Sequence, residues 1–406
     1  MSYYPDPMPD TPHQSPYESP LHQHHLDLDA YFLPYGADGD FAQVVETLGD
    51  LDMEYAALRK GCIIFDQPHV GTIRVTGEDR GSYLNNMITN KVDDLAAGKS
   101  IRAFWLNRKG RVDADLRLAQ RESDMLISVD RHICKATAET LAEFVFAEDA
   151  QVVNANDAYH RISIHGPSAA KLIEHASDEA TGCVTELNEY TSTHVNIAGA
   201  QVFVEREDLT GEIGLELCIP REHVLEVFHA LLKASQDHPE LKAREGGWLA
   251  MNAARIEAGH PLFNIDFGET NLPVESGIIE TRINFNKGCY LGQEVVARMH
   301  ARGACARKIV AIKVEDEQIT VENQEIHQPT GGSQLFEPGK EGQTPVGEVT
   351  SSTISPMLGA VPICFAMLKD AFTKPGMKLK VSAEGKLVDC TVQESLVFWK
   401  KPNAHG

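Results

Sequence analysis

The 406-residue sequence predicts an α+β protein that ends in a small β-barrel. As far as about residue 303, strand-like and helix-like stretches are interleaved without strict β-α-β alternation, which is typical of α+β layers. Beyond Arg307, short β-type runs are separated by Gly, Pro and Ser turns, a spacing that predicts a small barrel or sandwich. We therefore expect an α+β region over residues 41–303 and a β-barrel domain over residues 304–400.

The N-terminal segment is expected to be a disordered acidic tail over residues 1–40, because it is rich in Pro, Asp, His and Tyr and lacks periodicity. Eleven acidic residues and no Lys or Arg lie in the first 58 residues. The tail carries His22, His24 and His25, a group that could bind a metal ion, but solvated histidines are the better expectation and no metal site is predicted. The folded body is expected to begin with a helix near Phe41.

Hydrophobic periodicity gives the remaining elements in chain order. Strands are expected over residues 71–76, 101–106, 111–118, 125–129, 161–165, 201–205 and 213–219. Helices are expected over residues 41–51, 80–88, 133–146, 224–232 and 248–258, and Gly166-Pro167 opens another. Residues 107–110 are a credible hairpin turn, and Gly259 stands where a C-cap glycine belongs. The barrel strands are expected over residues 308–314, 346–354, 361–368, 378–383 and 387–393.

The composition indicates a protein of a reducing compartment that does not cross a membrane. No apolar run approaches the roughly 20 residues of a membrane helix. The eight cysteines form no C-x-x-C pair, which argues against a disulfide framework or a local zinc site. The acidic N-terminal segment resembles neither a mitochondrial transit peptide nor a secretory signal, so a cytoplasmic location is expected. The net charge of −22 disfavours direct nucleic-acid binding.

Residues 287–294 read Lys-Gly-Cys-Tyr-Leu-Gly-Gln-Glu, and this octapeptide is the most informative feature of the chain. Glycine on both sides of Cys289 allows a sharp turn of the backbone and a close approach to a ligand. Lys287 and the start of a short helical run at residues 295–299 would stabilise a thiolate over a thiol. The alternative is a buried cysteine in a tight turn, but the flanking Lys, Gln and Glu favour a reactive cysteine.

Three further groups supply carboxylates and a guanidinium. Glu212 and Glu216 stand near a Gly-framed strand start, Arg255 lies at the end of a helix, and Asp113 and Asp115 share one side of a strand. A carboxylate and a guanidinium that converge would suit a pterin, whose aminopyrimidinone edge offers adjacent donors and acceptors. The alternative for each group alone is an ordinary surface ion pair. The sequence has no Walker A loop, Rossmann G-x-G-x-x-G, Ser nucleophile elbow or H-E-x-x-H motif, so it gives no support to nucleotide-driven, hydride-transfer or zinc-protease chemistry.

Four blocks, taken in order, resemble the folate-binding superfamily of the glycine-cleavage T-protein, an aminomethyltransferase. These blocks are residues 65–80, 210–212, 254–259 and 347–359. The octapeptide looks like the signature of the YgfZ branch of that superfamily, whose members assist iron–sulfur cluster synthesis or repair and affect tRNA modification. The resemblance spans nearly all of residues 45–398. It implies a three-domain ring around a channel that takes up tetrahydrofolate, with two interleaved α+β domains in residues 41–303 and the barrel after them.

The resemblance also implies which residues hold the folate. Glu212 and Arg255 would lie at the pterin, and Asp115 would lie with them in the folate site. Gln293 and Glu294, which follow the cysteine in the octapeptide, would complete the set. The implied cofactor is tetrahydrofolate or a derivative of it.

Two features favour the YgfZ branch over aminomethyl transfer. Ala114 replaces the second acid of the T-protein's Asp-Asp pair, in which Asp115 is the other, and true T-proteins lack the cysteine motif. The resemblance then implies a folate-binding factor that assists iron–sulfur cluster assembly or repair, with Cys289 as a thiolate beside Lys287 and iron–sulfur proteins or assembly factors as partners. The alternative is a tetrahydrofolate-dependent aminomethyl or one-carbon transferase with Asp115 as its acid. A tRNA-binding module is the least favoured hypothesis because the chain is acidic.

Overall fold

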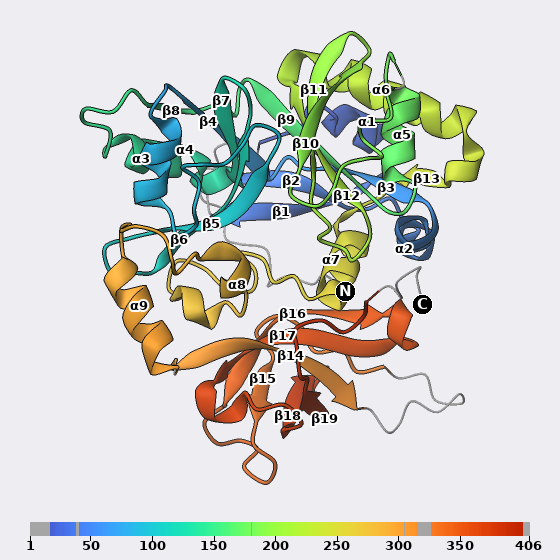
Figure 1. The fold of residues 1–406 in the computed structure, drawn as a ribbon. Helices are drawn as coiled ribbons and strands as arrows, with labels where there is room; N and C mark the ends of the chain where they lie inside the picture. The colour runs from blue at the N-terminus through green and yellow to red at the C-terminus, as the bar shows by residue number, and fades with distance from the viewer. Residues whose placement is uncertain (1–16, 38–39, 180, 304, 316–325, 401–406) are drawn as a thin grey trace.

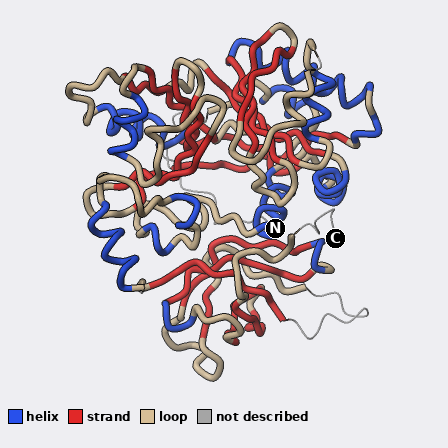
Figure 2. Tube along the Cα trace, viewed as in Figure 1, coloured by secondary structure: helices blue, strands red, loops and turns tan. Residues whose placement is uncertain are grey.

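The computed structural model describes residues 17–37, 40–179, 181–303, 305–315 and 326–400. It contains a five-stranded sheet, a six-stranded sheet, a two-stranded hairpin and a closed six-stranded barrel (Figure 1). Strands of the two large sheets run through the upper part of the molecule with helices at its outer sides, and the barrel forms the lower part (Figure 2). The predicted α+β fold with a C-terminal barrel is confirmed.

The N-terminal segment differs from its prediction. Residues 17–37 include α1 (His22–Asp27) and β1 (Tyr31–Ala37), so the expected disordered tail is wrong for this stretch, while residues 1–16 and 38–39 lie outside the described residues. β1 pairs antiparallel with β2 (Asp40–Thr47), which replaces the helix expected from residue 41. The physical reason is that Val44 and Val45, both buried, are β-branched and suit a strand that is covered on two sides. The helix begins later, as α2 (Leu51–Lys60).

The five-stranded sheet has the order β5-β6-β7-β4-β8. Its strands are β4 (Val70–Thr76), β5 (Ser100–Leu106), β6 (Val112–Gln120), β7 (Asp124–Asp130) and β8 (Gln151–Asn154). The helices α3 (Arg80–Met87) and α4 (Arg131–Ala142) share one buried apolar cluster with this sheet. The turn between β5 and β6 contains Gly110 at φ +71, and a Cβ there would lie 2.7 Å from the Val295 side chain. Glycine is therefore required for this hairpin to pack against the segment that follows the octapeptide.

The six-stranded sheet has the order β10-β11-β12-β9-β3-β13. Its strands are β3 (Cys62–Asp66), β9 (Tyr159–His165), β10 (Ser192–Ile197), β11 (Ala200–Arg206), β12 (Gly214–Pro220) and β13 (Ala243–Glu245). The helices α5 (Ala169–Ala176) and α6 (Val224–Asp237) pack on one face. α2 and α7 (Trp248–Ala258) pack on the other, because Ile63 and Phe65 alternate with Cys62 and Ile64 along β3. The chain makes β3 in this sheet, crosses to the other sheet for β4 to β8, and returns at β9.

The barrel has the strand order β14-β17-β16-β15-β18-β19. Its strands are β14 (Arg307–Glu315), β15 (Gln334–Phe336), β16 (Gly347–Ser355), β17 (Val361–Lys369), β18 (Lys378–Ala383) and β19 (Lys386–Val392). α8 (Ile279–Arg282) and α9 (Gln293–Arg302) lie between the sheets and the barrel along the chain. α7 ends at Gly259 in the left-handed region, as predicted, and a Cβ there would lie 2.7 Å from Val397. Within the described ranges, no helix has the length and apolar character needed to cross a membrane.

Candidate functional site

A cavity of about 130 Å³ lies where β1, both large sheets and α7 meet, and we call it the central cavity. Its wall is partly aromatic: the Tyr35 and Trp248 ring centroids are 6.0 Å apart, and the Phe65 and Trp248 centroids are 6.5 Å apart. The full lining is Tyr35, Phe65, Gln67, His69, Val70, Arg102, Asp115, Arg117, Ser128, Val129, Asp130, Leu209, Glu216, Trp248, Met251, Arg255, Leu262 and Phe263. Aromatic and aliphatic side chains thus share the wall with six charged ones, a combination that suits a heterocyclic ligand with polar edges.

Arginines and carboxylates form a buried network along one side of the central cavity. Glu207 accepts from Arg102 Nε at 2.6 Å and from Arg117 Nη1 at 2.8 Å. Burial opposes ionisation of Glu207, but the two guanidinium groups outweigh it and hold the pKa of Glu207 well below its usual range. Asp115 accepts from Arg282 Nε at 3.2 Å and lies 3.7 Å from Arg102 Nη1. The network therefore holds Asp115 in one orientation beside the cavity.

Five residues of the lining carry buried polar atoms that make no hydrogen bond to any described residue. The atoms are Gln67 Oε1, His69 Nδ1, Arg117 Nε, Glu216 Oε1 and Arg255 Nη2. A buried polar group without a partner costs about 1–3 kcal/mol. A ligand that offers both donors and acceptors would satisfy these groups, and the edge of a pterin offers both.

Asp130 is a lining residue that the sequence analysis missed. Its carboxyl accepts from Asn264 Nδ2 at 2.6 Å and from the Tyr35 hydroxyl at 3.3 Å. Burial raises the pKa of Asp130 to about 7. A carboxyl with this pKa can take up and release a proton near neutral pH. The residue stands immediately before α4, where an aspartate is read as an ordinary helix cap, yet its side chain makes no capping hydrogen bond.

The structure brings two of the five predicted folate residues to the central cavity and leaves Glu212, Gln293 and Glu294 outside its lining. Asp115 and Arg255 line it, and Arg255 Nη1 donates to Asp266 Oδ2 at 2.6 Å. Glu212 does not line it, and its Oε1 lies 3.8 Å from Arg59 Nη1. Glu216, four residues further along, is the carboxylate of this segment that faces the site.

The octapeptide lies apart from the central cavity. Lys287 is buried, and its ammonium donates to the carbonyls of Asn85, Ile88 and Asn90 at 2.5, 2.6 and 2.9 Å. Burial lowers the pKa of Lys287 to about 8. These three bonds use all the N–H groups of the ammonium, so Lys287 ties the octapeptide to the end of α3.

The other octapeptide residues are more accessible than Lys287. Cys289 is exposed, and α9 begins at Gln293, two residues before the predicted helical run, with Gly292 as its N-cap. Gln293 is half-buried and Glu294 is exposed, and neither lines the central cavity. The thiol of Cys289 is thus separate from the central cavity, which Asp115 and Arg255 line.

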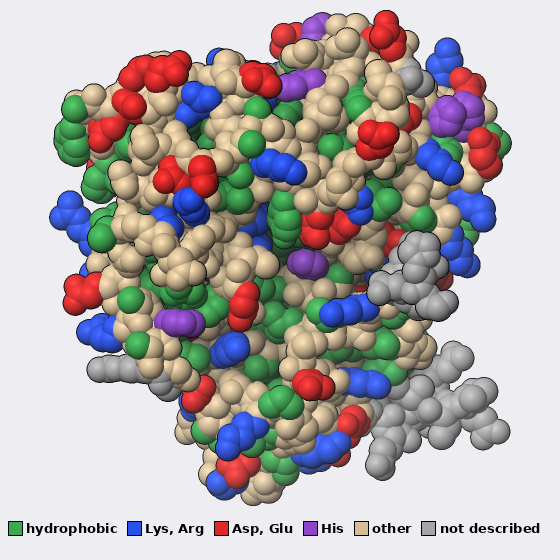
Figure 3. Space-filling model, in the orientation of Figure 1, with side chains coloured by type: hydrophobic (Ala, Val, Ile, Leu, Met, Phe, Trp, Pro, Cys, Tyr) green, Lys and Arg blue, Asp and Glu red, His purple; other side chains and the backbone are tan. Residues whose placement is uncertain are grey.

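A second, larger cavity of about 670 Å³ lies between the barrel and the ends of α7 and α8. His260, Lys308 and Lys400 are among its lining residues. Burial and the charges of Arg282 and Arg102 lower the pKa of His260 to about 4, although Glu207 opposes them. His260 is thus neutral near pH 7, and the lining also contains two glutamates, Glu280 and Glu394, beside the two lysines. On the face seen in Figure 3, acidic and basic side chains are interspersed.

Comparisons with known proteins agree with this geometry. A family model described as the GCVT N-terminal domain matches residues 22–287, and a model of the glycine cleavage T-protein C-terminal barrel domain matches residues 307–400. An aminomethyltransferase of Lysinibacillus sphaericus is 27% identical over 349 residues, which is 86% of this chain and 89% of that protein. An aminomethyltransferase of Caldanaerobacter subterraneus is 25% identical over 349 residues, which is 86% of this chain and 87% of that protein.

A solved structure extends the likeness to the fold. The glycine cleavage system aminomethyltransferase T of Bartonella henselae superimposes with a TM-score of 0.79, at 21% identity, over 95% of this chain and 99% of that one. At this identity the superposition bears on the fold alone, and it confirms the predicted T-protein-like architecture. Because the two family models together cover most of the sequence, the chain belongs to the glycine cleavage T-protein family.

Proposed function

We propose that the protein binds tetrahydrofolate with the pterin in the central cavity and transfers a one-carbon unit to it from an aminomethyl donor. The observation that carries this proposal is that five residues lining an aromatic-walled cavity carry buried polar atoms with no hydrogen-bond partner among the described residues. Relatives named aminomethyltransferases support the transfer reaction over other uses of the folate.

The residues of the central cavity suit distinct parts of this task. Trp248 and Phe65 offer ring faces to the pterin, and Glu216 and Arg255 offer an acceptor and a donor to its polar edge. The remaining p-aminobenzoylglutamate would extend toward the second cavity, where Lys308 faces its carboxylates.

The transfer needs groups that handle protons. The methylene carbon passes from the donor to the two folate nitrogens, and the protons of those nitrogens end on the departing sulfur and ammonia. Asp115, fixed by Arg282, is the acid that orients the folate amine, and Asp130, with a pKa of about 7, is suited to move a proton.

Replacing Asp115 with asparagine is expected to lower methylenetetrahydrofolate formation by about 100-fold or more, because a positioned acid–base group contributes roughly 10²–10⁴ to a rate. The assay supplies tetrahydrofolate with an aminomethyl-lipoyl donor and measures the methylene product. Asp113→Asn is the matched control: its carboxylate accepts from Asn107 at 2.7 Å and does not line the central cavity, so near wild-type rates are expected. Absence of any product from wild type with folate bound would refute the transferase function.

Cys289 supports a second candidate function, assistance to iron–sulfur cluster assembly or repair in the manner of the YgfZ branch. The supporting observation is exposure: Cys289 is exposed, whereas Cys183 and Cys305 are half-buried and the other five cysteines are buried. One thiol cannot hold an ordinary cluster, which takes about four cysteine ligands, so a second protein or a small thiol would supply the others.

In cells that lack this protein, expression of Cys289→Ser is expected not to restore the activity of cluster-dependent enzymes, whereas wild type restores it. Tetrahydrofolate binding by the variant is expected to stay unchanged. The hydroxyl cannot replace a thiolate as a cluster ligand. Cys305→Ser, a half-buried cysteine beyond α9, is the control and is expected to behave as wild type. Full recovery with Cys289→Ser would end the thiol hypothesis.

A further inference from the structure

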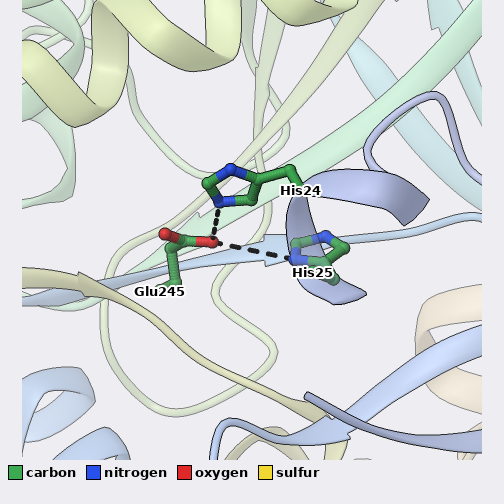
Figure 4. A group of neighbouring side chains, drawn as sticks. All are labelled: His24, His25 and Glu245. Carbon is green, nitrogen blue, oxygen red and sulfur yellow. Dashed lines mark hydrogen bonds and ion pairs between the residues drawn. The ribbon is translucent and has the colours of Figure 1, made fainter. Parts of the chain in front are cut away.

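Three side chains from distant parts of the chain converge outside the central cavity. His24 and His25 project from α1 toward Glu245 of β13, 221 residues away from His24 (Figure 4). His24 Nε2 lies 2.9 Å from Glu245 Oε2, and His25 Nδ1 lies 3.7 Å from the same oxygen. The side chains of His24 and Glu245 keep 23% and 15% of their surface exposed, whereas that of His25 keeps 5%. The cluster is thus built into the fold and still open to solvent on one side.

The tautomer of His25 is set by its other neighbour. His25 Nε2 lies 3.3 Å from Asp66 Oδ2, and Asp66 Oδ1 is 2.6 Å from His160 Nε2. The Asp66 carboxylate contacts both imidazoles and has no hydrogen to donate, so it accepts from each of them. His25 therefore donates through Nε2, and its Nδ1 presents a lone pair.

This lone pair has no partner in the described part of the chain. His25 Nδ1 is buried, makes no hydrogen bond to any described residue, and faces Glu245 Oε2. Two acceptors then face each other across 3.7 Å. A cation between the two acceptors would satisfy both.

We propose that His24, His25 and Glu245 bind one Zn²⁺ ion, with water as the fourth ligand. Two imidazoles and a carboxylate are a ligand set that Zn²⁺ takes, and bonds of about 2.0–2.1 Å in a tetrahedron put the ligand atoms about 3.3 Å apart. The two measured separations, 2.9 and 3.7 Å, lie on either side of that value. The Asp66–His25 contact is the carboxylate–histidine pair that commonly supports a metal-binding imidazole.

The proposed ion would fasten the N-terminal segment to the six-stranded sheet. Its two histidines lie on α1, which precedes β1, and β1 carries Tyr35 into the wall of the central cavity. Asp66 faces α1, whereas its neighbours Phe65 and Gln67 line the central cavity. The zinc site is therefore separate from the proposed folate site and supports it only through the position of β1.

The test is zinc binding by untagged, chelator-stripped protein, measured by competition with a chromophoric zinc indicator and by metal analysis after dialysis. Wild type is expected to bind one Zn²⁺ with a dissociation constant on the order of 1 μM or below, and Zn²⁺ is expected to raise its melting temperature. His24→Gln and Glu245→Gln are expected to weaken this binding about 100-fold and to remove the shift in melting temperature.

Two control variants distinguish zinc binding at the proposed site from adventitious binding to other histidines. His22→Gln removes a histidine of the same helix whose Nε2 lies 3.9 Å from Glu18, and His175→Gln breaks the stacked pair with His238. Both are expected to bind zinc as wild type does, and Mg²⁺, which prefers oxygen ligands, is expected to give no shift. The proposal would be overturned if wild type failed to bind Zn²⁺ at a concentration 100-fold above the expected dissociation constant. Undiminished binding by His24→Gln and Glu245→Gln would also overturn it.

Discussion

Replacing Glu257 with alanine is expected to lower the free energy of unfolding by about 3–5 kcal/mol, because the change leaves a buried guanidinium without its main carboxylate. Glu257 lies on α7 and is fully buried. Its Oε2 accepts from Arg59 Nη2 at 2.5 Å and from the Tyr55 hydroxyl, and its Oε1 accepts from the Ser355 hydroxyl. One carboxylate thus joins α2, α7 and the barrel, and the loss of these bonds loosens all three.

Urea unfolding followed by circular dichroism measures this effect. Glu139→Ala is the matched control, because Glu139 is exposed and lies 4.0 Å from the exposed Lys135 on the same helix. A surface pair of this kind contributes about 0–1 kcal/mol. A loss below about 1 kcal/mol for Glu257→Ala would mean that the three contacts do not hold the barrel to α2 and α7 in the way the structure indicates.

Replacing Glu216 with glutamine is expected to weaken tetrahydrofolate binding at least 30-fold. Glu216 is buried, lines the central cavity, and lies 3.7 Å from Arg117 Nη2, while its Oε1 has no hydrogen-bond partner among the described residues. Burial raises the pKa of Glu216 above its usual value, although the nearby arginines oppose this. Loss of a charge-assisted bond in a buried site costs about 2–5 kcal/mol, and each 1.4 kcal/mol is tenfold in affinity.

Glu212→Gln is the informative comparison for Glu216→Gln. Both residues are buried glutamates of one short segment, and the family resemblance implies Glu212 as the pterin ligand. Calorimetric titration of both variants with tetrahydrofolate is expected to leave Glu212→Gln within about threefold of wild type, since a residue outside the site acts only indirectly. A larger loss of tetrahydrofolate affinity in Glu212→Gln than in Glu216→Gln would indicate that the pterin binds at Glu212, as the resemblance implies.

The pair Glu212 and Glu216 illustrates what the sequence can and cannot predict. The Gly-framed block is recognisable, but Glu212 precedes β12 while Glu216 lies within it, opposite Ser163 of β9 and Glu205 of β11. Strand pairing decides which carboxylate faces the cavity, and pairing is a non-local property. The same holds for Asp130, whose partner Tyr35 is 95 residues away.

Hydrophobic periodicity predicted the elements in which it is clear, whereas amino-acid composition gave a wrong prediction for the N-terminal segment. Residues 17–37 are acidic and Pro-containing, yet burial of Leu33 and Tyr35 against α2 and α7 orders them. For Lys287, proximity in sequence to Cys289 suggested activation of the thiol, whereas carbonyls about 200 residues away take its three N–H groups. Such contacts form only in the folded chain, between segments that lie far apart in the sequence.

The placement of folate in the central cavity is tested most directly by tryptophan fluorescence, followed while the wild-type protein is titrated with tetrahydrofolate. A parallel titration of free tryptophan corrects for absorption of light by the folate. Trp248 lines the central cavity, while Trp105 lies in the core of the five-stranded sheet and the Trp399 ring is covered by the Arg59 guanidinium. Folate bound in the central cavity is expected to cause a saturable change in emission at one folate per chain, and this change is expected to disappear in Trp248→Phe. No saturable change, or the same change in Trp248→Phe, would contradict the placement of folate in the central cavity.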